Sequence, residues 1–214
     1  MTTFHLISIF PKSFTSYIEC SIIARAIKAK KIAVKFYDPR DYTADKHRSV
    51  DDRPYGGGPG MVMSAEPIIL AARAARWRRP KAKVYLLATT GKQFTNQLAG
   101  RLAKKNEDII IICGRYEGID ARVKKILRAE YLTIGPYVLT GGELPALVVI
   151  DAIARQIPGV LGKTESLEES RPAGREVYTR PEVMVIDGKN YRVPKVLLSG
   201  DHKKITDWRQ KRHR

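Results

Sequence analysis

The stretch Ile109–Asp151 decides the fold, and it reads IIIICGRYEGIDARVKKILRAEYLTIGPYVLTGGELPALVVID. Its four consecutive isoleucines predict a strand that is buried on both faces, as in a parallel sheet. The loop Gly114–Gly118 follows this strand, and a helical pattern then leads to a second short strand, Tyr131–Ile134. A further glycine-rich loop, Gly135–Gly142, precedes a helix whose first turn suits Pro145. Two glycine-rich loops therefore leave the carboxyl ends of two strands, the edge at which open α/β sheets bind small ligands.

Composition limits the class of protein. The chain has 214 residues, of which 43% are hydrophobic, so it is long and apolar enough to fold around a good core. Its 39 Lys and Arg against 22 acidic residues give a net charge of +17, which favours a polyanionic partner such as nucleic acid; general surface charge is the plain alternative. Cys20 and Cys113 make no disulfide framework, and no apolar run reaches membrane-spanning length. We expect a cytoplasmic protein with no membrane partner.

The rest of the first 162 residues continues the α/β pattern. Strands are predicted at Phe4–Phe10 and Ile32–Tyr37, joined by a helix that a Ser16–Glu19 capping box would begin. Strand, helix and strand in that order predict a right-handed parallel unit. Val84–Ala88 is another buried strand, and the turn that follows it ends at Gly91. This turn is a third loop at the carboxyl edge of the sheet.

Two stretches between these strands suggest contact with a substrate. The long loop Asp38–Gly60 ends in Gly-Gly-Gly-Pro-Gly, which fits no phosphate-binding pattern and is better explained as a lid or a substrate-contact segment. No second His or Cys stands at ligand spacing from His47, so we predict no metal-ligating residues. A helix is expected at Glu66–Arg76, and Ala72–Lys83 holds six basic residues and no acid. That segment is either a phosphate-backbone patch or an ordinary solvated helix end.

The C-terminal part has a different composition. Lys163–Val177 is rich in Glu, Ser, Pro and Gly, which is typical of a linker. Tyr178–Trp208 predicts a small second unit with a hairpin, because Asp187-Gly188 stands between the apolar runs Val183–Ile186 and Tyr191–Leu198. The tail from His202 onward carries six Lys or Arg against one Asp.

Six ordered motifs resemble those of a known family. They are YGGGPGM from Tyr55, CGRYEGID from Cys113, IGPYVLTGGELP from Ile134, IPGVLG from Ile157, YTRPEV from Tyr178 and VLLSGDH from Val196. Together they closely resemble bacterial tRNA (guanine-N1)-methyltransferases, the TrmD type of the SPOUT superfamily. The resemblance implies an α/β SPOUT fold with a deep trefoil knot, and a homodimer whose active sites are shared between subunits. It further implies a cofactor-binding and catalytic domain over 1–162, a flexible linker over 163–177 and a shortened C-terminal tRNA-binding unit over 178–214.

The resemblance also implies S-adenosylmethionine as methyl donor and N1 of guanosine 37 in tRNA as acceptor. The cofactor would be held largely by backbone groups, which glycines allow to approach closely. The matching positions are Leu86, Leu87, Gly91, Gly114, Tyr116, Gly118, Ile134, Gly135, Pro136, Tyr137, Val138, Leu139, Gly141, Gly142 and Pro145.

Three catalytic residues are implied in the same way. Glu169 aligns with the aspartate that serves the family as general base, with Glu168 as the second candidate. Arg155 matches the arginine that stabilises charge on guanine O6, and Glu117 would position substrate, cofactor or the Mg²⁺ that aids the family. From the residues alone, Arg155 is better explained as a cation that caps a helix end, and Glu117 as a surface partner of Arg115.

The sequence departs from the family pattern in three places. Glutamate replaces the aspartate at 169, Ala-Thr-Thr-Gly replaces Ser-Pro-Gln-Gly at 88–91, and the sequence stops at Arg214, where relatives continue with further helices. Two alternatives therefore stay open: a SPOUT methyltransferase for another RNA position or a ribose hydroxyl, and a non-catalytic RNA-binding relative. We expect the basic tail to replace part of the missing tRNA contact.

Overall fold

A computed structural model describes residues 1–77, 79–162 and 176–211 of the chain. It divides into two compact units, Met1–Gly162 and Lys163–Arg214. The predicted base Glu169, its alternative Glu168 and most of the predicted linker lie outside the described residues. Among the described residues, no helix is both long and apolar enough to span a bilayer.

The first unit is built on a five-stranded parallel sheet, which confirms the predicted α/β class. The strand order is β2-β1-β6-β5-β7, and every pairing is parallel. The four isoleucines of β6 are fully buried between β1 and β5, as their sequence predicts. Strand bounds are β1 Thr2–Ile7, β2 Ile32–Tyr37, β5 Lys83–Gln93, β6 Ile109–Ile112 and β7 Glu130–Thr133.

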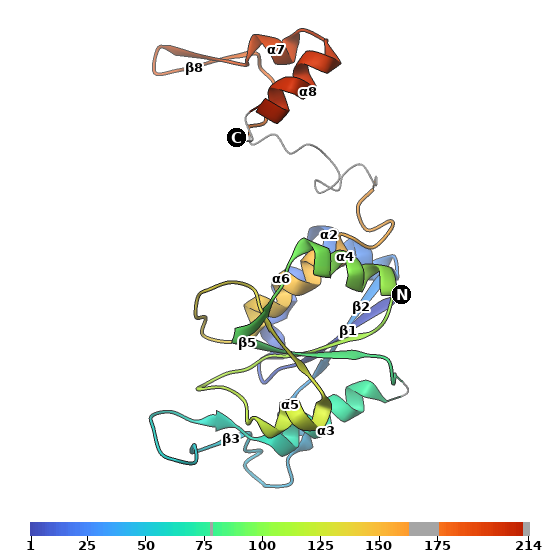
Figure 1. Cartoon of the computed structure of the whole chain (residues 1–214), viewed down its shortest axis with the longest axis vertical. Helices are drawn as coiled ribbons and strands as arrows, with labels where there is room; N and C mark the ends of the chain where they lie inside the picture. The colour runs from blue at the N-terminus through green and yellow to red at the C-terminus, as the bar shows by residue number, and fades with distance from the viewer. Residues whose placement is uncertain (78, 163–175, 212–214) are drawn as a thin grey trace. The chain divides into compact units, whose positions relative to one another are not determined.

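Helices cover both faces of this sheet, so two hydrophobic cores form (Figure 1). One core packs beneath α2 (Ser21–Lys28), α4 (Asn96–Lys105) and α6 (Glu143–Ala154). The other packs beneath α3 (Ala65–Arg76) and α5 (Arg122–Leu127). A sheet buried on both sides requires near-continuous apolar strands, and this is why β6 carries no polar side chain.

Strand β5 departs from the predicted Val84–Ala88, because it resumes after a bulge. Leu132 of β7 is the partner of both Leu87 and Lys92, so residues 88–91 loop out between them. Gly91 has a φ of +137°, and a Cβ there would lie 2.7 Å from the backbone carbon of Tyr131. Only glycine avoids this clash, and the loop therefore stays at the carboxyl edge while the strand continues beyond it.

The predicted capping box at Ser16 and Glu19 is wrong, because the helix it would begin is broken in two. A 3₁₀ turn (η1, Pro11–Phe14) leads into α1 (Thr15–Ile18), whose N-cap makes no side-chain hydrogen bond. The backbone then turns at Ser21, where φ is +50°. The two pieces pack on different partners: the Tyr17 hydroxyl donates to Asp151 of α6 at 2.6 Å, whereas α2 buries Ile23 on the sheet.

The long loop between β2 and α3 is partly ordered. It contains the 3₁₀ turn η2 (Pro39–Tyr42) and a two-residue strand, β3 (Asp51–Asp52). β3 pairs antiparallel with β4 (Val62–Met63), so the glycine-rich segment 56–60 forms the bend between them. This pairing brings the end of the segment back to the sheet.

The second unit contains the predicted hairpin. β8 (Val183–Ile186) and β9 (Lys189–Arg192) pair antiparallel across a two-residue turn in which Asp187 and Gly188 both have positive φ. The predicted strand as far as Leu198 is wrong, because Pro194 lacks the N–H that a ladder needs and caps α7 (Lys195–Leu198) instead. α8 (His202–Lys211) completes the described part.

Candidate functional site

The three loops predicted from the sequence converge on one cavity of about 1660 Å³. They leave β5, β6 and β7, which are neighbours in the sheet and run in the same direction. The carboxyl ends of parallel strands meet at one edge, and the crevice there is where such sheets bind ligands. Ligand sites usually measure about 300–1,000 Å³, so this cavity has room for a cofactor and part of a second molecule.

Nearly all predicted cofactor residues line this cavity. The exceptions are Gly91, whose role is the bulge of β5, and Pro136. The residues that line it are Leu86, Leu87, Gly114, Tyr116, Gly118, Ile134, Gly135, Tyr137, Val138, Leu139, Gly141, Gly142 and Pro145. Tyr116 itself adopts a left-handed backbone with φ of +57°, and its ring is half exposed.

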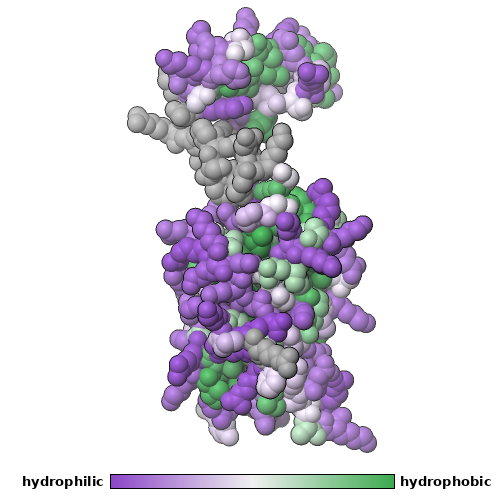
Figure 2. All heavy atoms as spheres, turned by 90° about the vertical axis from the view of Figure 1, so that its right-hand side faces the viewer, coloured by the Kyte–Doolittle hydropathy of each residue, from purple (hydrophilic) through white to green (hydrophobic). Residues whose placement is uncertain are grey.

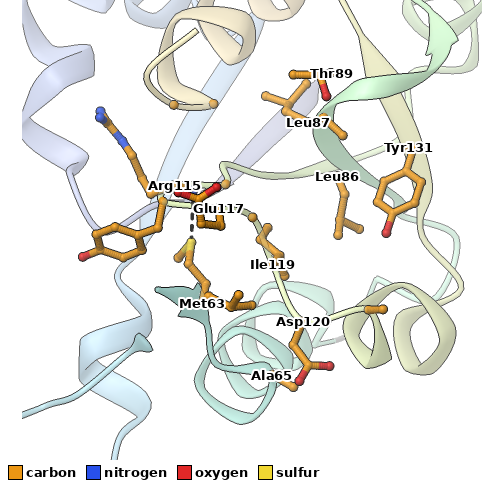
Figure 3. Close-up of a pocket in the computed structure, with 18 of the residues that line it drawn as sticks. Met63, Ala65, Leu86, Leu87, Thr89, Arg115, Glu117, Ile119, Asp120 and Tyr131 are labelled. Atoms are coloured by element: carbon orange, nitrogen blue, oxygen red, sulfur yellow. Dashed lines mark hydrogen bonds between the residues drawn. The ribbon is translucent and has the colours of Figure 1, made fainter. Parts of the chain in front are cut away.

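The segment after the glycine run supports the loop that follows β6 (Figure 3). The backbone N–H of Glu117 donates to Met61 at 3.0 Å, and the N–H of Met63 donates to Gly118 at 2.9 Å. The N–H of Arg115 points at the Met63 sulfur, 3.2 Å away. A Cβ on Gly60 would lie 2.6 Å from a Glu117 carboxylate oxygen. Met61 and Met63 therefore support the loop that carries Glu117, and the glycine at 60 leaves room for its carboxylate, whereas a Cβ on Gly56, Gly57 or Gly58 would meet no atom within 4 Å.

A buried carboxylate joins two of the loops. Glu143, at the start of α6, is only 4% exposed and accepts a hydrogen bond from the Ser8 hydroxyl at 2.7 Å. Its other oxygen lies 2.9 Å from Nε of Arg115, and among the described residues these two atoms have no partner besides this ion pair. The Arg115 guanidinium also donates to the carbonyl of Thr140 at 3.2 Å and lies 4.7 Å from the centre of the Phe10 ring.

We call Ser8, Glu143 and Arg115 the loop clamp. It ties the end of β1 to the loops that follow β6 and β7, so it fixes the spacing of two cavity walls. The same loops touch through backbone, since the N–H of Gly142 donates to the carbonyl of Gly114 at 2.9 Å. A Cβ on Gly142 would lie 2.6 Å from the Cα of Cys113, and only glycine permits this approach.

The cavity wall combines apolar side chains with charges of both signs. Leu86, Ile119 and Tyr131 come from three different segments and lie around the cavity in Figure 3. Glu117 and Asp120 add carboxylates. Arg122 donates to Asp120 at 2.6 Å, and this hydrogen bond lowers the pKa of the Asp120 carboxyl. Such a wall fits a ligand that has both an apolar ring and a cationic group.

The three predicted catalytic residues do not meet in the described part of one chain. Glu117 lines the cavity, and Glu169 lies outside the described residues. Arg155 caps the far end of α6, twelve residues beyond Glu143, which at 1.5 Å per residue is about 18 Å along the helix. Arg155 is not among the residues that line the cavity. The roles of these residues stay predictions.

The described residues contain no cluster of possible metal ligands. Within 1–77, 79–162 and 176–211, no three His, Cys, Asp or Glu side chains gather closely enough to hold an ion. The Mg²⁺ that the resemblance implies therefore stays a prediction.

The sequence interpretation missed Ser8 and Glu143. An acidic residue in the first turn of a helix is ordinary, because it complements the helix dipole, so Glu143 gave no sign of its burial. Ser8 follows β1 without any motif. Only the hydrogen bond between the Ser8 hydroxyl and the Glu143 carboxylate identifies these two residues as part of the site.

Comparisons with known proteins agree with the geometry. The family model described as tRNA (Guanine-1)-methyltransferase TrmD matches residues 2–214. A Pseudoalteromonas atlantica protein is 46% identical over 213 residues, covering 97% of this chain and 78% of its own length. A Dictyoglomus turgidum protein is 46% identical over 215 residues, covering 99% and 84% respectively. An Aliivibrio fischeri protein is 47% identical over 211 residues, covering 96% and 83%. All three are named tRNA (guanine-N(1)-)-methyltransferase.

Proposed function

The chain belongs to the tRNA (guanine-1)-methyltransferase family TrmD, and on that premise we propose that it methylates N1 of guanosine 37 in tRNA, with S-adenosylmethionine as donor. The observation that carries the proposal is the cavity at the carboxyl edge of β5, β6 and β7, lined by the three loops that match the family. A net charge of +17 supports a polyanionic substrate.

The three loops would hold the cofactor. S-adenosylmethionine supplies an electrophilic methyl group on a sulfonium. Gly118 lines the cavity and a Cβ there would meet no protein atom within 4 Å, so its backbone is open to a ligand, while Leu87 and Pro145 offer apolar contact. Glu117 and Asp120 place carboxylates on the same wall, where a cationic group gains most from them.

Methylation of guanine N1 requires a general base and a nearby cation. Guanine N1 carries a proton, so a general base must remove it, and negative charge then develops on O6. We assign the base to Glu169, with Glu168 as the second candidate, and the O6 contact to Arg155. Glu117 would position the substrate or cofactor, since it already lines the cavity.

A homodimer would complete the site. Arg155 lies about 18 Å along α6 from Glu143 and does not line the cavity, so we assign the O6 contact to the Arg155 of a second copy. Leu144 and Val148 of α6 are 62% and 47% exposed, and Val138 of the neighbouring loop is 81% exposed. Large apolar side chains gathered on the outside favour burial by a partner.

The remaining expectations fit this function. The cofactor and catalytic domain would span 1–162 and contain the trefoil knot. A linker over 163–177 would carry the base, and the unit over 178–214 would bind tRNA through its basic tail. The enzyme would act in the cytoplasm, where tRNA is modified.

The test is transfer of labelled methyl from S-adenosylmethionine to a tRNA transcript, for the wild type and Glu169→Gln. Transcripts that differ only at position 37 are the control. We expect transfer that requires guanosine 37 and falls at least 100-fold in the variant, since general-base catalysis contributes roughly 10²–10⁴-fold. Transfer to other nucleotides would favour a different RNA position, and binding without transfer would favour a non-catalytic RNA-binding protein. Full activity in Glu169→Gln would move the base to Glu168.

A further inference from the structure

One face of α3 runs from the cavity to the end of the helix. Glu66, Leu70, Arg73 and Trp77 are exposed and are spaced four, three and four residues apart, so they share one face. Glu66, Leu70 and Arg73 line the large cavity. Arg73 also lines a second cavity of about 440 Å³, together with Trp77. We call these four residues the α3 strip, and it connects the two cavities without interruption.

The outer end of the α3 strip presents an aromatic ring among arginines. Trp77 is 71% exposed, although its indole is among the largest apolar groups that a core can bury. Arg76 donates to the carbonyl of Pro80 at 3.2 Å, and Arg79 donates to the carbonyl of Trp77 at 3.1 Å. These two bonds fix the backbone on either side of Trp77, so the ring is held outside the core rather than left loose.

The surroundings favour a nucleic acid as the occupant. The segment Ala72–Lys83 carries six basic residues and no acid. Figure 2 views the first unit from the side toward which α3 ends, and hydrophilic residues cover most of its surface there. A protein partner could also bury the indole, since Trp is enriched at protein interfaces, but the six basic residues beside the ring and the net charge of +17 favour a polyanion. A nucleic acid offers both phosphates for the arginines and a base for the indole, and base–aromatic stacking contributes about 1–3 kcal/mol per base.

We propose that the α3 strip, together with the neighbouring Arg76 of the second cavity, binds the RNA that flanks the target nucleotide, with Trp77 stacking on a base and Arg73 and Arg76 contacting phosphates. This inference rests on the proposed function, because it requires an RNA substrate in the large cavity. Trp77 lies four residues beyond Arg73, about 6 Å along the helix axis. That spacing puts the ring within reach of a base near the nucleotide in the cavity. Trp77 and Arg73 would thus set how the substrate strand enters.

The experiment measures binding of a fluorescent tRNA transcript by anisotropy over a range of salt concentrations. The variants are Trp77→Ala, Trp77→Phe, and Arg73→Ala combined with Arg76→Ala. The matched control is Arg101→Ala combined with Lys104→Ala, which removes two charges from exposed positions of α4 on the opposite face of the sheet. The melting temperature of each variant reports whether it keeps its fold, and the affinity of the wild type for S-adenosylhomocysteine is measured by calorimetry without RNA.

We expect Trp77→Ala to weaken tRNA binding roughly 5-fold or more with an unchanged salt dependence, and Trp77→Phe to restore most of the affinity. The arginine pair should lower the slope of log affinity against log salt by about 1.4, since each phosphate contact on a single strand contributes about 0.7. The α4 control should change neither quantity as much.

Equal losses in the α3 and α4 variants would overturn the inference, because general surface charge would then explain the binding. Unchanged affinity in Trp77→Ala would also overturn it. Either result leaves the proposed function standing if the wild type still methylates its tRNA. A wild type that binds S-adenosylhomocysteine but no tRNA would instead remove both the α3 strip and the proposed substrate.

Discussion

Replacing Glu143 by Gln tests whether the loop clamp shapes the cofactor cavity. The substitution keeps the size of the side chain and an oxygen for the Ser8 hydroxyl, but it removes the charge that faces Arg115. Removing one partner from a fully buried ion pair costs roughly 3–5 kcal/mol. The Arg115 side chain is 25% exposed and keeps Thr140 as a partner, so we expect about 2 kcal/mol, typical of a charged hydrogen bond.

Thermal unfolding measures this loss. A domain of 150–250 residues shifts by about 2–4 °C per kcal/mol, so the melting temperature should fall by roughly 4–8 °C. Because the clamp joins two cavity walls, affinity for S-adenosylhomocysteine should fall as well, by about 10-fold. The Arg115→Gln variant should lose more, because it also removes the Thr140 contact and leaves the buried Glu143 carboxylate without its cation; adding Glu143→Gln to it should have little further effect, since both changes break the same contact.

A partly buried control separates the effect of the loop clamp from general destabilisation. Asp108→Asn disturbs a hydrogen-bonded cluster formed by Asp108, His5 and Arg79. None of these three side chains lines the large cavity. It should lower the melting temperature without changing the affinity for S-adenosylhomocysteine. The reasoning is refuted if Glu143→Gln melts within about 1 °C of the wild type, or if its loss adds fully to that of Arg115→Gln.

Three further outcomes follow from the described residues. Gly142→Ala should lower the free energy of unfolding in urea by roughly 1–3 kcal/mol and abolish detectable cofactor binding, because its Cβ would meet the backbone of Cys113. The control Gly162→Ala places its Cβ in open space and should change neither stability nor cofactor binding. The free energy of unfolding should fall as the pH drops below about 6.5, because burial lowers the pKa of His5 in the folded protein and the unfolded chain therefore takes up the proton first. Equal urea midpoints for the wild type at pH 7.5 and at pH 5.5 would contradict this expectation. Protonation of Asp108 should lower the free energy of unfolding further below about pH 4. Desolvation opposes ionisation of this carboxyl, but hydrogen bonds from His5, Thr3 and Arg79 lower its pKa overall in the folded protein. Removing residues 203–214 should weaken tRNA binding and reduce its salt dependence, since it deletes six basic residues, and unchanged affinity would show that the tail makes no contact.

Local sequence patterns were enough to predict most of the strands of the first unit and the hairpin of the second. The isoleucine run of β6, the β2 strand at Ile32–Tyr37 and the Asp187-Gly188 hairpin turn each follow from rules that act over a few residues. The glycine-rich loops at the carboxyl edge could be predicted for the same reason, because parallel strands bring their ends together. The break between α1 and α2 could not be predicted, since α1 contacts α6 through Tyr17 and Asp151, which are far apart in the sequence.

The tertiary structure alone decided how the site is held together. Ser8 and Glu143 stand 135 residues apart, and nothing in either neighbourhood marks them as partners. The backbone of Met61 and Met63, just after the glycine run, supports the loop that carries Glu117, and no local pattern marked this contact; the role of the preceding loop as a lid or substrate contact stays a prediction. The sequence by itself predicted the three loops that line the cavity, because those follow strand ends, but not the residues of α3 that line it as well. Long-range contacts determined which residues position them, because such pairs form only once the sheet has brought distant segments into contact.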